Sequence, residues 1–229
     1  MIICGLDFET TGLSPQTDRV IEIGLVLWDT DLHAPVALYG SLVRSEVKVP
    51  KEVTTINNIT DDMLQKYGVA QDAALCTVSG WMKKSEAACA HNGTGFDKLF
   101  YEQWCLREKK PFENTFLWID TCIDLGAPIG RLIHAAAERG FVNPFPHRAV
   151  TDVLTMLRIL DYYDANEVVR QARIPNVTVQ ALVNYDDREK AKARGYHWNG
   201  ETRQWLRAVK EDQLEKEKRE APFKVLVMK

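Results

Sequence analysis

The chain has 229 residues, of which 45% are hydrophobic and 27% are charged, and its formal net charge at pH 7 is −3. These proportions are those of globular proteins, so the composition excludes a fibrous or an intrinsically disordered chain. The N-terminal apolar run reaches Asp7 too early for a signal peptide, and no run is long enough to span a bilayer. We therefore expect a cytoplasmic protein without a membrane partner.

Strands dominate the first part of the chain. Residues 2–8, 20–29 and 36–44 are short runs of apolar and β-branched side chains separated by turn-rich stretches, which predicts a meander of three strands. This order, followed by alternating helices and strands, indicates a mixed α/β sheet. The later patterns predict helices at 69–84 and 131–139, a helix that begins near Gly95, a helix whose first turn carries Asp152, and strands at 86–91 and 116–119.

A break near Pro175 predicts a domain boundary. Residues 1–175 carry 17 basic and 23 acidic side chains, a balance of −6, whereas residues 176–229 carry 12 basic and 9 acidic side chains, a balance of +3. We therefore expect a first domain at 1–175 and a small basic α+β module at 176–229. The cationic side chains that are candidates for phosphate contacts are Arg188, Lys190, Lys192, Arg194 and Arg203.

The module has a strand and helix pattern of its own. Asn199-Gly200-Glu201, between aromatic segments, is a strong signal for a hairpin turn. Trp198 and Trp205 flank this turn, and we expect them to form the core of the module, with base stacking as the alternative. Strands are expected at 177–185, 204–209 and 223–228, and helices at 187–194 and 211–220.

Asp7 and Glu9 stand two residues apart at the end of the first apolar run, so that on a strand both side chains point to the same face. At a separation of about 4 Å and an effective dielectric constant near 20, two such charges repel by roughly 4 kcal/mol. The pair stays ionised only if cations offset this repulsion. Mg²⁺ prefers carboxylate oxygens, and two metal ions about 4 Å apart can hold the attacking and leaving oxygens of a phosphodiester.

Two further motifs follow this pair: HNGTGFD at 91–97, which ends in Asp97, and HRAVTD at 147–152, which begins with His147 and ends in Asp152. Together with DFETTGL at 7–13, they resemble in order and spacing the three motifs of the DEDDh 3′→5′ exonucleases. That family includes the proofreading subunit of bacterial DNA polymerase III, ribonuclease T and oligoribonuclease. The resemblance covers roughly residues 1–165. It implies a ribonuclease-H-like α/β fold, with a mixed five-stranded sheet flanked by helices.

The resemblance assigns the motif residues to a metal-dependent site. Asp7, Glu9, Asp97 and Asp152 are expected to bind two divalent cations, Mg²⁺ or Mn²⁺, because all of their ligand atoms are oxygens. His147 is expected to act as the general base for the attacking water, since an imidazole can accept a proton at neutral pH. The stretch at 186–205 also resembles a small module that is appended to some bacterial and phage exonucleases.

The turn after the first strand is expected to meet the 3′-terminal nucleotide. In the family this contact uses backbone amides and an apolar wedge, for which Leu13 is the candidate, with packing on the domain as the alternative. Phe145 is available for base stacking or for packing, and His91 is expected to be a structural histidine. The candidate substrate-binding residues are Thr10, Thr11, Gly12, Leu13, Asn92 and Phe145.

The expected activity is the release of 5′-mononucleotides from single-stranded or frayed DNA or RNA ends by a two-metal mechanism. A phosphodiesterase acting on short or cyclic oligonucleotides is one alternative. A non-catalytic nucleic-acid-binding protein is another, and the five intact motif residues argue against it. The choice between DNA and RNA stays open, because it depends on contacts with the 2′-hydroxyl. A homodimer, or a polymerase or repair partner, also stays open.

Overall fold

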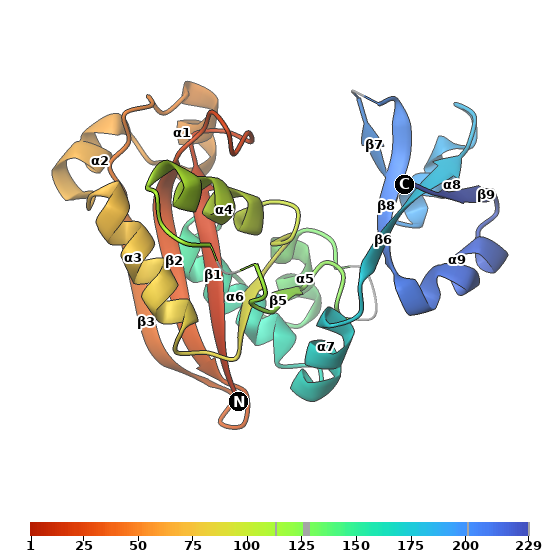
Figure 1. Cartoon of the computed structure of the whole chain (residues 1–229), viewed down its shortest axis with the longest axis horizontal. Coiled ribbons are helices and arrows are strands. Elements are labelled where there is room, and N and C mark those ends of the chain that lie inside the picture. Colours follow the sequence, from red (N-terminus) through yellow and green to blue (C-terminus); the bar gives the residue numbers. More distant parts are fainter. Residues whose placement is uncertain (113, 126–128, 201, 229) are drawn as a thin grey trace. The chain divides into compact units, whose positions relative to one another are not determined.

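Three long strands at the start of the chain form an antiparallel meander (Figure 1): β1 Ile2–Thr10, β2 Val20–Asp29 and β3 Ala34–Leu42. The computed structural model describes residues 1–112, 114–125, 129–200 and 202–228. β2 lies between β1 and β3 and is buried along nearly all of its length. The predicted meander is confirmed.

Two short strands complete the sheet beside β1. β4 (Ala87–Ala90) pairs in parallel with β1, and β5 (Trp118–Asp120) pairs in parallel with β4. The strand order is β3-β2-β1-β4-β5. This is the mixed five-stranded sheet of the ribonuclease-H-like architecture, so the predicted fold class is confirmed.

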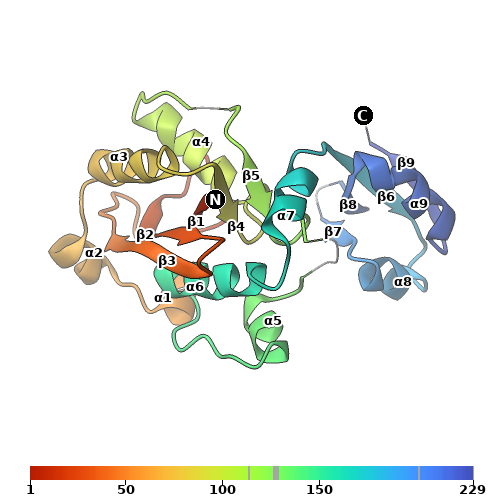
Figure 2. The same ribbon diagram turned by 90° about the horizontal axis from the view of Figure 1, so that it is seen from below.

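Helices cover both faces of this sheet, with α3 and α4 on one face and α6 on the other (Figure 2). Two of the helices, α1 and α7, are absent from the elements expected above; both are short, and each buries a single residue. Among the described residues, no helix has the length and hydropathy needed to cross a membrane. The helices are α1 Lys51–Asn57, α2 Asp61–Tyr67, α3 Gln71–Met82, α4 Asp97–Arg107, α5 Leu132–Glu138, α6 Ala149–Leu160 and α7 Ala165–Ala172.

Side chains of β1 alternate between the two faces of the sheet. The even-numbered side chains from Cys4 to Phe8 are buried in the core formed with α3 and α4. The odd-numbered residues Gly5, Asp7 and Glu9 lie on the opposite face, which α6 covers. A Cβ atom at Gly5 would lie 2.7 Å from side-chain atoms of α6, so the helix lies directly against this strand.

A glycine in β2 lets the start of α6 approach the sheet. Gly24 stands opposite Asp7 in the β1–β2 pair. A Cβ atom at Gly24 would lie 2.3 Å from the carbonyl carbon of Ala149. Because the obstacle is backbone, no larger residue fits without moving the helix. At Gly40 in β3 the corresponding distance, to the Cβ of Val150, is 3.5 Å, which is an ordinary contact.

The chain divides into two compact units, Met1–Val169 and Arg170–Lys229. The described part of the second unit contains an antiparallel sheet of order β7-β8-β6-β9 and helices at 188–193 and 214–220, which confirms the expected α+β module. β7 and β8 form the predicted hairpin, and Glu201 of its turn lies outside the described residues. The elements are β6 Asn176–Leu182, α8 Arg188–Ala193, β7 His197–Asn199, β8 Gln204–Lys210, the 3₁₀ turn Glu211–Gln213, α9 Leu214–Glu220 and β9 Lys224–Val227.

The module has its own core, built around Val179 and Tyr196. The prediction that both tryptophans belong to this core is wrong for Trp198, which is 53% exposed. Trp205 is half-buried and packs against the core. The difference arises because β7 is an edge strand of three residues and has a neighbouring strand on one side only.

Gly24→Ala should lower the free energy of unfolding by about 1–3 kcal/mol, because the added methyl group must displace the start of α6 from β2. Gly40→Ala is the matched control, since its methyl group meets the same helix at an ordinary contact distance. Thermal and urea unfolding measure both variants. Equal stability of the two would contradict the close contact at Gly24.

Candidate active site

The end of β1 carries two carboxylates on the face that α6 covers. Asp7 and Glu9 are both half-buried. Their partners across the β1–β2 pair are Gly24 and Glu22. The two acids share one face because side chains alternate along a strand, as the sequence predicts.

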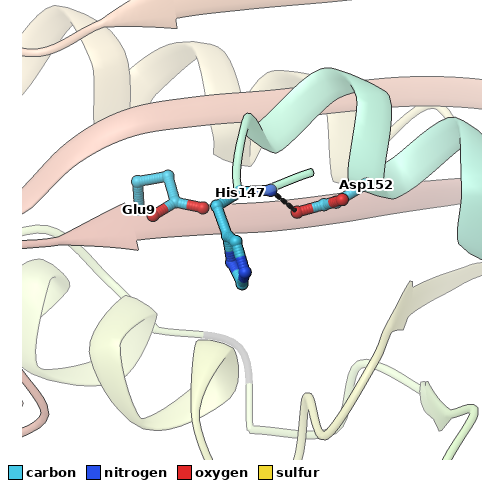
Figure 3. A group of neighbouring side chains, drawn as sticks. All are labelled: Glu9, His147 and Asp152. Carbon is cyan, nitrogen blue, oxygen red and sulfur yellow. Dashed lines mark hydrogen bonds between the residues drawn. The ribbon is translucent and has the colours of Figure 1, made fainter. Parts of the chain in front are cut away.

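The loop before α6 and the first turn of α6 bring His147 and Asp152 to the same place, and His147 stands between Glu9 and Asp152 in Figure 3. One ligand atom from each of these three residues lies within 4.8 Å of the other two. The backbone N–H of His147 donates to Asp152 Oδ2 at 2.9 Å. His147 has a φ of 62°, in the left-handed region, and such strained conformations cluster at functional sites.

Asp97, the first residue of α4, is buried beside β1. Its Oδ1 accepts a hydrogen bond from the backbone N–H of Phe8 at 3.0 Å. β4 ends at Ala90 and does not pair with this part of β1, so the carboxylate takes the place of a strand partner. Asp97 thus adjoins the segment that carries Asp7 and Glu9, and it has a structural role that the sequence does not reveal.

Burial and mutual repulsion raise the pKa values of the four acids. Burial raises the pKa of Glu9 to about 7, against a hydrogen bond from Asn57 that lowers it. Burial also raises the pKa of Asp97 to about 8. The pKa of Asp7 is well above its ordinary range because of burial and the charges of Asp97 and Glu9. Burial raises the pKa of Asp152 in the same direction.

This donor set fits a hard divalent cation. The four carboxylates offer oxygen ligands, which Mg²⁺ and Mn²⁺ prefer. Each is disfavoured in its charged form unless a positive charge lies nearby. A bound cation would supply that charge and lower the pKa values of all four acids.

Two buried asparagines restrain the carboxylates. Asn57 Nδ2, at the end of α1, donates to Glu9 Oε2 at 3.0 Å. Asn143 Nδ2 donates to Asp152 Oδ1 at 2.5 Å. Each amide restricts the rotation of its carboxylate. Sequence reasoning missed both, because an isolated asparagine has no distinguishing spacing.

An ion pair ties β2 to the residue that follows His147. Arg148 Nη2 lies 2.6 Å from Glu22 Oε1, and Arg148 Nε lies 3.1 Å from both carboxylate oxygens. The backbone N–H of Ala149 donates to Glu22 Oε2 at 3.0 Å. Because Glu22 stands opposite Glu9, the guanidinium also offsets a like charge. Arg148 is visible within the third motif, but its partner lies 126 residues away.

Asp120, at the end of β5, shapes the loop that precedes α4. Its carboxylate accepts from the backbone N–H groups of Asn92 and Thr94, both at 3.0 Å. Asn92 is exposed and has a φ of 62°. His91 is hydrogen-bonded to Thr121 Oγ1 at 2.8 Å, so the expected structural histidine is confirmed.

The other candidate substrate residues differ in accessibility. Leu13 is 85% exposed and Phe145 is 65% exposed, so both are free to contact a substrate. The side chain of Thr11 is buried and makes its hydrogen bonds within the turn. Thr10 Oγ1 donates to the carbonyl of Gly12 at 2.5 Å. The threonine side chains therefore hold the turn, and the backbone N–H groups of Thr11 and Ser14 donate within the protein as well. The exposed side chain of Leu13 remains available for a substrate.

Sequence comparisons identify relatives for both parts of the chain. Residues 4–160 match the RNase T exonuclease family, and residues 177–228 match a domain of unknown function, DUF8626. DNA polymerase III subunit epsilon of Treponema pallidum is 30% identical over 162 residues, which cover 67% of this chain and 72% of that protein. An oligoribonuclease of Neisseria meningitidis serogroup C is 20% identical over 181 residues, which cover 75% of this chain and 95% of that protein.

Solved structures share the fold. E. coli exonuclease I in complex with a dA16 oligonucleotide superposes with a TM-score of 0.62 and 14% identity over 79% of this chain, which spans 48% of that protein. The nuclease domain of 3′hExo, a DEDDh family member bound to rAMP, superposes with a TM-score of 0.61 and 21% identity, covering 70% of this chain and 90% of that one. With the three motifs and the five-stranded sheet, these matches confirm the resemblance, and the chain belongs to the RNase T exonuclease family.

Proposed function

We propose that this protein is a metal-dependent 3′→5′ exonuclease that releases 5′-mononucleotides from single-stranded or frayed DNA or RNA ends. One observation carries the proposal: ligand atoms of Glu9, His147 and Asp152 meet within 4.8 Å of one another at the end of β1. Asp7 and Asp97 adjoin this group. The similarity to exonuclease I, whose complex contains an oligonucleotide, supports a single strand as the partner.

Asp7, Glu9 and Asp152 are the residues that would hold the cations, with Asp97 beside them. Two Mg²⁺ or Mn²⁺ ions would neutralise charge on the phosphate and make the attacking water more acidic. The chain's own contribution is orientation, because the amide side chains described above keep Glu9 and Asp152 from rotating. Such preorganisation supports catalysis, since ligands already in position need no rearrangement during the reaction.

His147 is the proposed acceptor of the proton from water. Its loop is anchored by its own backbone bond to Asp152 and by the ion pair of the next residue with Glu22. The water oxygen attacks phosphorus, its proton passes to the imidazole, and the bond from phosphorus to the 3′ oxygen of the preceding nucleotide breaks. That oxygen leaves as a 3′-hydroxyl after it takes a proton from solvent. The released nucleotide keeps the 5′-phosphate.

The exposed turn after β1 is the proposed site for the 3′ terminus. Leu13 would act as a wedge against the terminal base, because its side chain is exposed and the turn beneath it is held by internal hydrogen bonds. A Cβ atom at Gly12 would lie 2.5 Å from Asp18, so this turn accepts only glycine there without rearrangement. The similarity to an oligoribonuclease favours short oligonucleotides as further substrates.

Asp152→Asn should abolish hydrolysis of 5′-labelled strands of about 20 nucleotides in Mg²⁺, because it removes a cation ligand. The parent protein should shorten DNA or RNA strands from the 3′ end and leave a circular single strand intact. Asp62→Asn, an exposed carboxylate on α2, is the control and should behave like the parent. Rapid cleavage of the circle that is lost in Asp152→Asn would contradict an exonuclease.

His147→Gln should reduce kcat by about 10²- to 10⁴-fold, the usual effect of removing a general base. Thermal unfolding should still shift upward when Mg²⁺ or Mn²⁺ is added, because the carboxylates remain. Loss of this metal-dependent shift together with activity would make His147 a cation ligand and not the base.

Glu9→Gln should stabilise the metal-free protein at pH 8. Because the pKa of Glu9 is raised to about 7, above its unfolded value, this group favours folding at low pH and the contribution is lost as the pH rises through 7. Glutamine resembles the protonated form and can still accept the bond from Asn57. The gain over the parent should be about 1–3 kcal/mol at pH 8 and should vanish near pH 4.

Thermal unfolding in EDTA across this pH range measures the effect of Glu9→Gln. Added Mg²⁺ should stabilise the parent more than the variant, because the variant lacks a ligand. A parent that is more stable than Glu9→Gln at pH 8 in EDTA would argue against the repulsive cluster.

A further inference from the structure

The most exposed of the six tryptophans stands at the edge of the C-terminal sheet. Trp198 is 53% exposed, whereas Trp28, Trp104 and Trp118 are at most 5% exposed. The remaining two are half-buried. An indole has a large apolar surface, and leaving it in water forgoes the free energy that its burial would give.

Trp198 and Trp205 form one aromatic surface, here called the aromatic pair. They stand opposite each other in the β7–β8 hairpin, with ring centroids 5.7 Å apart. On its other side Trp205 is in register with Ala181, which belongs to the module core. The two rings therefore lie on the face of the sheet that carries the module core, and they extend that apolar face to β7, the edge strand.

Cations flank the same end of the sheet. Arg203 lies in the turn before β8 and is exposed, and it makes no ion pair with any residue that the structure describes. Arg188 lies 3.8 Å over the ring of Tyr185, which is 77% exposed. Tyr185 and Arg188 follow the end of β6, and Ala181 near that end pairs with Trp205. Tyr185 and Arg188 therefore lie at the end of the sheet where the β7–β8 hairpin turns.

Several other cations of the module are paired with acidic side chains. Arg194 and Arg207 bind Glu217 at 2.7 and 3.3 Å. Lys190 lies 2.8 Å from Asp187. Arg194 is therefore a structural residue and not the free cation that its sequence position indicates. Arg203 is thus left without an ion pair to any described residue. Arg188 combines its contact with the Tyr185 ring with an exposed ion pair to Glu189 at 3.7 Å, which is a weak interaction in water.

We propose that the aromatic pair, with Arg203 and Arg188, forms a binding site for single-stranded nucleic acid in which a base stacks on Trp198 and phosphates contact the arginines. The choice of partner rests on the proposed function. Every base has a π face, so stacking tolerates any sequence, as an enzyme that removes successive nucleotides requires. The +3 balance of residues 176–229 complements a polyanion, and residues 1–175 lack such a balance.

Binding to the full-length protein in EDTA tests this site without hydrolysis. Strands of dT and rU of about 20 nucleotides should quench tryptophan fluorescence, and fluorescence anisotropy of labelled strands gives Kd. Trp198→Ala should raise Kd for both strands by about 5- to 100-fold, the range for the loss of one stacked base. Trp198→Phe should keep most of the affinity, because it retains an aromatic face, but should lose most of the quenching. Arg203→Gln should reduce the salt slope of binding by about 0.7.

Two controls separate stacking from general effects. Leu226 is 37% exposed and lies on the opposite face of the same sheet, so Leu226→Ala should leave Kd unchanged. A strand of the same length with abasic sites in place of bases should bind the parent and Trp198→Ala alike, because only phosphates remain. Thermal unfolding shows whether Trp198→Ala lowers the stability of the module. If it does, the affinity of Trp198→Phe and the fluorescence quenching of the parent test whether a base stacks on Trp198.

Hydrolysis of a dinucleotide in Mg²⁺ distinguishes this inference from the proposed function. If the parent hydrolyses the dinucleotide but shows neither quenching nor a difference in Kd from Trp198→Ala, the binding site is overturned and the nuclease stands. If the parent binds with quenching but hydrolyses nothing, the nuclease proposal fails and the binding site stands.

Discussion

The candidate site depends on how closely the first turn of α6 approaches the sheet. Gly24 leaves room for the backbone of Ala149, and Glu22 holds both the Arg148 guanidinium and the Ala149 N–H across the same contact. Only with the helix in this position do Asp152 and the loop before it reach the end of β1. A displacement of about 1 Å would separate groups whose chemistry needs near contact. The missing side chain at Gly24 in β2 thus determines how the site residues on β1 and α6 are placed relative to one another.

The repulsion and burial of the four site acids destabilise the metal-free protein. Hydrogen bonds and a nearby guanidinium reduce this destabilisation but do not remove it. Burial raises the pKa of Glu9 to about 7 and that of Asp97 to about 8, so the charged forms remain unfavourable even with hydrogen bonds from Asn57 and the β1 backbone. Arg148 offsets the charge of Glu22 and so limits its repulsion of Glu9. The cluster of acids thus lowers the stability of the metal-free protein, and bound cations would restore it by mass action.

The C-terminal module treats its charges differently. Although burial raises the pKa of Glu217, its contacts with Arg194 and Arg207 hold that pKa below the ordinary range. This group is internally compensated and belongs to the structure of the module. The edge formed by Trp198 and Arg203 has no comparable compensation among the described residues. Exposed apolar and cationic groups on this single edge are the basis of the proposed binding site.

The sequence by itself determined the meander, the α/β order and the motif acids, because these depend on local periodicity and on short spacings. Asp7 and Glu9 must share a face on any strand, since side chains alternate with a period of two. Only the tertiary structure revealed Asn57 and Glu22, which act on partners 48 and 126 residues away. It also decided the exposure of Trp198, because alternation assigns a residue to a face but does not tell where the sheet ends. Contacts between distant segments and the limits of a sheet are properties of the folded chain, and no local pattern encodes them.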